Sequence, residues 1–164
     1  MNYDKTIKCI LLGDENVGKT TLCNFLDTGD FTTNYISTIG IDYVSYYLTL
    51  NTIKYKLQLW DTAGQERFRA LTQCYFKNTK LVFIMFDYTD QNSFDNVHFW
   101  IDEFLKYSSN VKFIIIGNKI DLDKVISDKD IQLLKDKLID YNFDFISISI
   151  KNNINLDKLK NIIA

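Results

Sequence analysis

Short apolar runs alternate along the chain with segments in which apolar residues recur at helical spacing. We predict strands over residues 7–12, 41–50, 54–60, 81–86, 112–116 and 144–149. The first, fourth and fifth are almost wholly apolar, which is typical of parallel strands buried on both faces. The second alternates in polarity and joins the third through Asn51-Thr52, so the two predict a hairpin with one edge strand.

The intervening segments predict helices over residues 21–26, 69–77, 93–107, 128–139 and 156–164. Ser93 and Ser127 stand where N-cap residues belong. The expected core positions of two helices are Phe94, Val97, Ile101 and Leu105 in one and Ile131, Leu134 and Leu138 in the other. This order of elements predicts a doubly wound α/β fold: a mostly parallel six-stranded sheet with one antiparallel edge strand and helices on both faces.

Composition limits the possible classes of protein. The 164 residues, 46% of them hydrophobic, predict a single domain over residues 1–164. A net charge of −2 argues against binding to nucleic acid or to an anionic membrane surface. The longest apolar runs are too short to cross a bilayer and the N-terminus has no apolar signal region, so we expect a cytosolic protein. Cys9, Cys23 and Cys74 lack metal-ligand spacing and are predicted to be reduced, buried residues.

A phosphate-binding loop is predicted at Gly13–Thr20, read as Gly-Asp-Glu-Asn-Val-Gly-Lys-Thr, between a strand and a helix. Its glycines permit backbone conformations in which successive N–H groups converge on a phosphate at the positive end of the helix dipole. Lys19 would bridge the outer phosphates and the Thr20 hydroxyl would bind Mg²⁺. The alternative is a simple glycine turn, which the strand, loop and helix context disfavours.

Further polar residues follow the next predicted strands, and the carboxyl ends of parallel strands meet at one edge of the sheet. Asp61 is placed to hold Mg²⁺, through water. Gly64 can bring its backbone N–H close to a terminal phosphate, and Gln65 can orient a water for in-line attack. Alone, these residues would be read as a turn.

The segment Gly117-Asn118-Lys119-Ile120-Asp121 follows the strand over 112–116. The Asp121 carboxylate can accept two hydrogen bonds from the N1 and N2 donors of guanine, a pair that adenine lacks. Asn118 would tie this loop to the phosphate loop, and the Lys119 stem would cover one face of the base. The alternative, a polar turn without a ligand, is disfavoured by the order and spacing of the three motifs.

With these motifs the chain resembles a Ras-superfamily small GTPase, specifically of the Rab family, over nearly its whole length. The segments 39–43, 56–60 and 60–68 carry the likeness to Rab proteins. The resemblance implies Phe31 beside the guanine, Tyr35 over the phosphates, and Thr38 as second Mg²⁺ ligand and γ-phosphate sensor. It also implies nucleotide contacts by Gly13, Glu15, Asn16, Val17, Gly18, Thr21, Leu122, Ser149, Ile150 and Lys151. Ile41 and the aromatic triad Tyr43, Trp60 and Tyr75 would report the nucleotide state to effectors.

The resemblance further implies a switch in vesicle trafficking that binds GTP and GDP with Mg²⁺. The only arginines, Arg67 and Arg69, are not placed to act on the γ-phosphate, so we expect slow intrinsic hydrolysis and a GTPase-activating protein that supplies an arginine in trans. An exchange factor and GTP-state effectors are the other expected partners of a monomer. The last residues, 161–164, contain no lipidation signal, so we expect a trimmed GTPase domain whose longer form reaches the cytosolic face of an endomembrane.

Three departures from the Rab pattern stand out. Glu15 places an acidic side chain in the phosphate loop, and we expect it to face solvent because an unpaired carboxylate beside phosphate is costly. Ile150 is larger than the usual alanine, and Tyr43 replaces phenylalanine. Two alternatives stay open: an ATPase or nucleotide kinase, which Asn118 and Asp121 oppose, and a GTP-bound scaffold that no longer hydrolyses its nucleotide.

Overall fold

The computed structural model describes residues 3–29, 31, 41–62 and 75–163. Its strands are β1 (Lys5–Leu12), β2 (Ile41–Leu50), β3 (Ile53–Thr62), β4 (Leu81–Asp87), β5 (Lys112–Asn118) and β6 (Phe143–Ser147). They form one six-stranded sheet in the order β2-β3-β1-β4-β5-β6, in which only β2 is antiparallel to its neighbour. The predicted fold class, including the antiparallel edge strand, is therefore confirmed.

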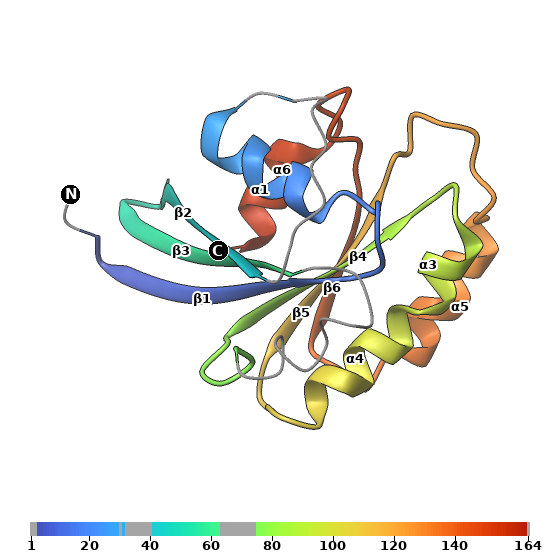
Figure 1. The fold of residues 1–164 in the computed structure, drawn as a ribbon, viewed down its shortest axis with the longest axis horizontal. Helices are drawn as coiled ribbons and strands as arrows, with labels where there is room; N and C mark the ends of the chain where they lie inside the picture. Colours follow the sequence, from blue (N-terminus) through green and yellow to red (C-terminus); the bar gives the residue numbers. More distant parts are fainter. Residues whose placement is uncertain (1–2, 30, 32–40, 63–74, 164) are drawn as a thin grey trace.

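The described helices cover both faces of this sheet (Figure 1). They are α1 (Lys19–Thr28), α3 (Gln91–Asp95), α4 (Val97–Leu105), α5 (Asp128–Lys137) and α6 (Leu156–Ile163). Helices α1 and α6 pack on one face, and α3, α4 and α5 lie on the other. None of the helices in the described part of the chain has the length and apolar character needed to span a membrane.

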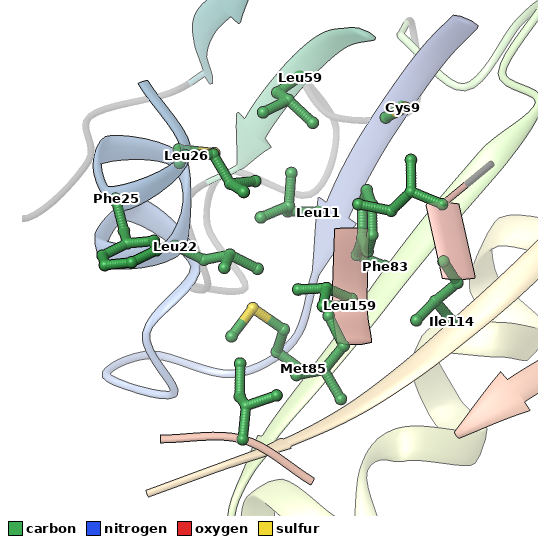
Figure 2. Close-up of a cluster of buried hydrophobic side chains, with 14 of the residues drawn as sticks. Cys9, Leu11, Leu22, Phe25, Leu26, Leu59, Phe83, Met85, Ile114 and Leu159 are labelled. Atoms are coloured by element: carbon green, nitrogen blue, oxygen red, sulfur yellow. The ribbon is translucent and has the colours of Figure 1, made fainter. Parts of the chain in front are cut away.

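The alternation of side chains along β1 divides the core into two layers. Cys9 and Leu11 face the layer under α1 and α6, where they pack with Leu22, Leu59 and Met85, as Figure 2 shows. The alternate residues of the same strand belong to the layer under α4 and α5. Both faces of the strand are buried from Cys9 to Leu12, which explains the unbroken apolar sequence of those residues.

Several predictions about single residues are confirmed. Cys9 and Cys23 are buried, while Cys74 lies outside the described residues. Ser127 caps α5 in a capping box with Asp130, each side chain accepting a hydrogen bond from the other residue's backbone N–H. The predicted core residues of α4 and α5 that are fully buried are Val97, Ile101, Ile131, Leu134 and Leu138, and Phe94 and Leu105 are partly buried.

The helix predicted over 93–107 is wrong in its start and its continuity. It begins earlier, at Gln91, and is divided by a turn at Asn96 into α3 and α4. Asp90 is the N-cap, accepting from the backbone N–H of Asn92. Ser93 is not a cap, because its buried hydroxyl instead accepts from the backbone N–H of Asp87 and donates to the carbonyl of Asp90.

Other boundaries also differ from the predictions. The helix predicted over 69–77 falls mostly outside the described residues, and its last part, 75–77, is a turn rather than a helix. Helix α5 ends at Lys137 instead of residue 139, and β6 ends at Ser147 instead of residue 149. Beyond β6 the chain forms an isolated bridge between Ser149 and Ile154, so this segment is a loop beside the sheet edge.

Candidate nucleotide-binding site

The phosphate loop connects the end of β1 to the start of α1. Gly13 and Gly18 both have positive φ, 139° and 106°, and Asn16 has φ 62°. A Cβ atom on Gly13 would overlap the carbonyl oxygen of Met85 in β4, and one on Gly18 would overlap the carboxamide of Asn118. The loop therefore requires glycine at both positions for shape as well as for backbone conformation. Gly18 makes no side-chain cap to α1, and the positive end of the helix dipole lies at this loop, a position that favours an anion.

Lys19 is the buried cation of this loop. Its side chain is 6% exposed, and its ammonium donates to the backbone carbonyls of Gly13 at 2.9 Å and Asp14 at 2.7 Å. Burial lowers the pKa of Lys19 to about 8, and nearby carboxylates, Asp61 foremost, oppose that shift. Lys19 is thus a desolvated positive charge whose ammonium is hydrogen-bonded to two neutral carbonyls, an arrangement suited to an anionic ligand.

Thr20 and Asp61 bring two oxygen ligands together from distant parts of the chain. The Thr20 hydroxyl donates to the Asp61 carboxylate at 2.5 Å, and Asp61 is 1% exposed at the end of β3. Hydroxyl and carboxylate oxygens are the hard ligands that Mg²⁺ prefers. The donor set therefore fits the predicted metal, and it lies one residue from Lys19.

Asn118 joins the predicted base loop to the phosphate loop. Its Nδ2 donates to the carbonyl of Val17 at 2.9 Å, and its Oδ1 accepts from the backbone N–H of Ile150 at 3.4 Å. One buried carboxamide thus links three loops that lie more than thirty residues apart from one another in sequence. This is the link predicted for Asn118, and it extends to the segment after β6.

The other residues predicted to contact the base differ in backbone conformation and in exposure. Lys119 has positive φ, 65°, and its ammonium forms an ion pair with Asp87 at 2.5 Å. Asp121 is partly exposed and Leu122 is exposed at the same edge of the sheet. In the adjoining loop, Ser149 and Ile150 are buried and Lys151 is exposed.

The three aromatic residues predicted as an effector readout pack against one another in a row, with their rings tilted. The rings of Tyr43 and Trp60 have centroids 4.9 Å apart, and those of Trp60 and Tyr75 are 5.0 Å apart. Tyr43 is exposed, whereas the other two are half-buried. The three side chains are in contact, and their role toward a partner stays a prediction.

Several predicted site residues cannot be located. Tyr35, Thr38, Gly64 and Gln65 lie outside the described residues, as does the side chain of Ile41. Among the predicted nucleotide contacts that are described, Phe31, Glu15 and Asn16 are exposed, Val17 is buried and Thr21 is half-buried. The exposure of Glu15 agrees with the expectation that it faces solvent.

Two anchors of the site were missed from the sequence. The Asp14 carboxylate accepts from Asn96 Nδ2 at 2.6 Å and from Trp100 Nε1 at 2.8 Å, which fastens the phosphate loop to the start of α4. The second is the ion pair of Lys119 with Asp87 at the end of β4. The sequence signal for these anchors was a carboxylate in the glycine-rich loop, Asp14, and one at a strand end, Asp87. Their partners are distant in sequence, so the pairing could not be predicted.

A sheet with a glycine-bounded loop, a buried lysine and a hydroxyl–carboxylate pair at the carboxyl ends of its strands defines the class of phosphate-binding-loop nucleotide proteins. The Ras family model matches residues 8–164 of the chain. Among known proteins, the Ras-related protein RAB1BV of Beta vulgaris is 38% identical over 161 residues, which cover 96% of this chain and 74% of the relative.

The GTP-binding protein ypt2 of Schizosaccharomyces pombe is 40% identical over 160 residues, covering 96% of this chain and 78% of the relative. The Ras-related protein Rab-8B of Bos taurus is 40% identical over 161 residues, covering 95% and 75%. The chain therefore belongs to the Ras family, and within it to the Rab GTPases.

Proposed function

We propose that this Rab GTPase binds GTP and GDP with Mg²⁺, hydrolyses GTP slowly, and acts as a switch in membrane trafficking. The observation that carries the proposal is the link between the two halves of the site, in which Asn118 donates to the carbonyl of Val17 in the phosphate loop. Because this bond fixes the base loop against the phosphate loop, one ligand with both a base and phosphates can engage the two loops together.

Charge neutralisation at the phosphates is the role proposed for the phosphate loop. On nucleotide binding, the Lys19 ammonium would turn from the carbonyls of Gly13 and Asp14 to the outer phosphate oxygens. Hydrolysis of GTP develops charge on these oxygens, and a preorganised cation and loop amides stabilise it without further rearrangement. The lowered pKa of Lys19 would rise again once its ammonium faces an anion.

Thr20 and Asp61 are the described residues proposed to hold Mg²⁺, with Thr38 as a further ligand. When bound, the ion would neutralise phosphate charge and fix the orientation of the triphosphate. For this the Thr20 hydroxyl must stop donating to Asp61 and present its lone pair to the ion, which a rotation of the hydroxyl hydrogen achieves. Gln65 is the residue proposed to orient the attacking water, next to the backbone N–H of Gly64.

Guanine selection is proposed for Asp121, whose carboxylate would accept from N1 and N2 of the base. Lys119 would cover one face of the base, and its ion pair with Asp87 keeps the stem in place. The adjoining loop, Ser149 to Lys151, would close the base pocket, with Phe31 at its edge. Ile150 is already packed 2% exposed in this loop, so its extra carbon atoms are accommodated within the protein.

Single-turnover hydrolysis of GTP by the purified protein tests the enzymatic part of the proposal. We expect a rate constant of about 10⁻⁴ s⁻¹ alone and an acceleration of about 10³- to 10⁵-fold with the catalytic domain of a Rab GTPase-activating protein, which supplies an arginine. Gln65→Leu is the matched variant: it should retain GTP and lose the acceleration. An unassisted rate above about 10⁻² s⁻¹ would contradict the need for an arginine in trans.

The switch itself rests on differential affinity. Partners that bind only while a γ-phosphate is present would engage the aromatic row of Tyr43, Trp60 and Tyr75 together with the neighbouring segments. Its Rab relatives suggest a site of action at an endomembrane, where the cytosolic face would meet effectors, an exchange factor and an activating protein. Equal affinity of a Rab effector for the GTP- and GDP-loaded protein would refute the switch.

A GTP-bound scaffold without hydrolysis is the second candidate, and Glu15 is the observation that favours it. This exposed carboxylate of the phosphate loop acts on the charge of Lys19, so it lies within electrostatic range of the phosphates. Glu15→Ser separates the two candidates. A scaffold whose hydrolysis is blocked by Glu15 gains GTPase activity in this variant, whereas a slow GTPase retains the rate of the parent protein.

A further inference from the structure

Tyr88 follows β4 directly and is hydrogen-bonded to the segments that form both loops of the proposed base pocket. It is 3% exposed, and its backbone N–H donates to the carbonyl of Asn118 at 3.0 Å. Its own carbonyl accepts from the backbone N–H groups of Val125 at 2.9 Å and Ile126 at 3.4 Å. The backbone of Tyr88 is therefore tied to the chain on both sides of Asp121.

The ring of Tyr88 packs against the backbone at Gly117, where the base loop begins. A Cβ atom on Gly117 would overlap the edge of this ring and would come within 2.6 Å of the Phe86 ring. The two rings pack against each other with centroids 5.1 Å apart. Residue 117 must therefore be glycine for a steric reason, and the main chain that leads into Asn118 rests directly on the aromatic pair.

The hydroxyl of Tyr88 reaches the other base loop. It shares a hydrogen bond of 2.6 Å with the hydroxyl of Ser147, where β6 ends and the segment to Lys151 begins. The backbone continues the same connection, because the N–H of Ile148 donates to the carbonyl of Gly117 at 2.7 Å. Burial raises the pKa of Tyr88, so the phenol remains protonated and able to share this bond.

We infer that Tyr88 is a positioning residue for guanine recognition, which holds the loop of Asp121 and the loop of Ser149 at a fixed separation. The inference rests on the proposed function, because the two loops are assigned to the base there. A pocket fixed in this way needs no ordering when the nucleotide enters, so the Tyr88–Ser147 bond contributes to affinity without touching the ligand. It also keeps the Asp121 carboxylate aligned with the N2 amino group that distinguishes guanine.

The test compares GTP with ITP, because hypoxanthine lacks the N2 amino group of guanine. The GTP-to-ITP affinity ratio therefore measures the hydrogen bond from N2 to Asp121. In Tyr88→Phe and, separately, in Ser147→Ala, we expect GDP to dissociate about three- to tenfold faster, as for the loss of one buried hydrogen bond. We also expect the GTP-to-ITP ratio to fall by a similar factor. Fluorescent GDP release and competition titrations measure both quantities.

Tyr55→Phe is the matched control. Tyr55 is a buried tyrosine near the start of β3, at the opposite end of the strands, so losing its hydroxyl should leave both quantities unchanged. The double variant Tyr88→Phe/Ser147→Ala should be no more impaired than the worse single variant, because both remove the same bond. Additive losses would overturn the inference.

Two further outcomes separate this inference from the proposed function. If the parent protein binds GTP tightly and both single variants keep its release rate and its GTP-to-ITP ratio, the positioning role is refuted while the function stands. The role is equally refuted if release accelerates without any change in the ratio, since that indicates general loosening. A parent protein that does not bind GTP contradicts the proposed function itself.

Discussion

The phosphate end and the base end of the proposed site are held in place by different means. At the phosphate end, Lys19 is buried against the carbonyls of its own loop, and α1 begins without a side-chain cap. At the base end, Asn118 and Lys119 are both bound to other side chains or backbone groups of the protein. The lysine of the first region is hydrogen-bonded to neutral carbonyls, whereas the lysine of the second is paired with a carboxylate.

This difference separates the sources of affinity and of specificity. A desolvated cation at the positive end of a helix dipole gains most from an anion, so the phosphate end should supply most of the binding free energy. A base loop that is fixed before binding presents the Asp121 carboxylate in a defined geometry, which favours discrimination between bases. The predictions below test this division from the largest expected effect to the smallest.

Asp121→Asn should reverse the base preference of the site. Xanthine carries an oxygen where guanine has its N2 amino group, so a carboxamide can donate where the carboxylate would repel. We expect the GTP-to-XTP affinity ratio to change by about 10⁴-fold, the scale on which a hydrogen-bonding pocket rejects an unmatched ligand. Competition titrations with GTP, ATP and XTP measure it. The control is Asp123→Asn, which changes an exposed carboxylate two residues away. An unchanged ratio in Asp121→Asn would show that Asp121 does not contact the base.

Lys19→Met should weaken binding without altering base preference. Loss of charge-assisted bonds to the phosphates is expected to lower GDP affinity by about 100-fold or more, while the GTP-to-XTP ratio stays that of the parent. Isothermal titration measures the affinity. Lys54→Met changes the same charge at the opposite end of the sheet and should have no effect. A changed base preference in Lys19→Met would show that the two ends do not act separately.

GDP affinity should depend on pH through the same lysine. Its pKa is lowered from about 10.5 to about 8 in the nucleotide-free fold, so the free protein loses the ammonium above pH 8. The affinity for GDP should then be about tenfold lower at pH 9 than at neutral pH. At higher pH the loss should approach tenfold for each further pH unit. Between pH 8 and about 10.5, Lys19 binds more protons in the unfolded chain than in the fold. The nucleotide-free fold should therefore also gain stability as the pH rises through that window.

Lys19→Arg is the control for this titration, since a guanidinium stays charged throughout the range. Its GDP affinity should be independent of pH between 7 and 9, even if it is lower than that of the parent. A parent protein whose GDP affinity is constant over this range would show that Lys19 keeps its proton. The buried ammonium would then be better stabilised by the protein itself than its burial indicates.

The strand-end motifs of the site were predictable from sequence because parallel strands bring their carboxyl ends to one edge. That rule placed Thr20 beside Asp61 and Asn118 beside the phosphate loop, and the structure has both contacts. Each motif could be placed from the strand that it follows and from the parallel direction of the strands. The local patterns that predict strands and turns were therefore sufficient for these residues.

The braces of the site were not predictable, because their partners are joined only by tertiary packing. Nothing near Tyr88 in sequence indicates that its hydroxyl meets Ser147. The break between α3 and α4 was missed for a related reason. A run with helical spacing reads as one helix, but Asn96 lies in a turn from which its carboxamide donates to Asp14 in the phosphate loop.

The smallest effect is expected from the brace at the phosphate end. Trp100→Phe removes the indole N–H that donates to Asp14 but keeps a buried ring, so the packing of α4 is largely retained. Loss of one hydrogen bond to a carboxylate should accelerate GDP release by about fivefold, measured with fluorescent GDP. In an Asp14→Ala background the same substitution should have no further effect, because its partner is already gone. Acceleration that persists in that background would mean that Trp100 acts through packing rather than through its hydrogen bond to Asp14.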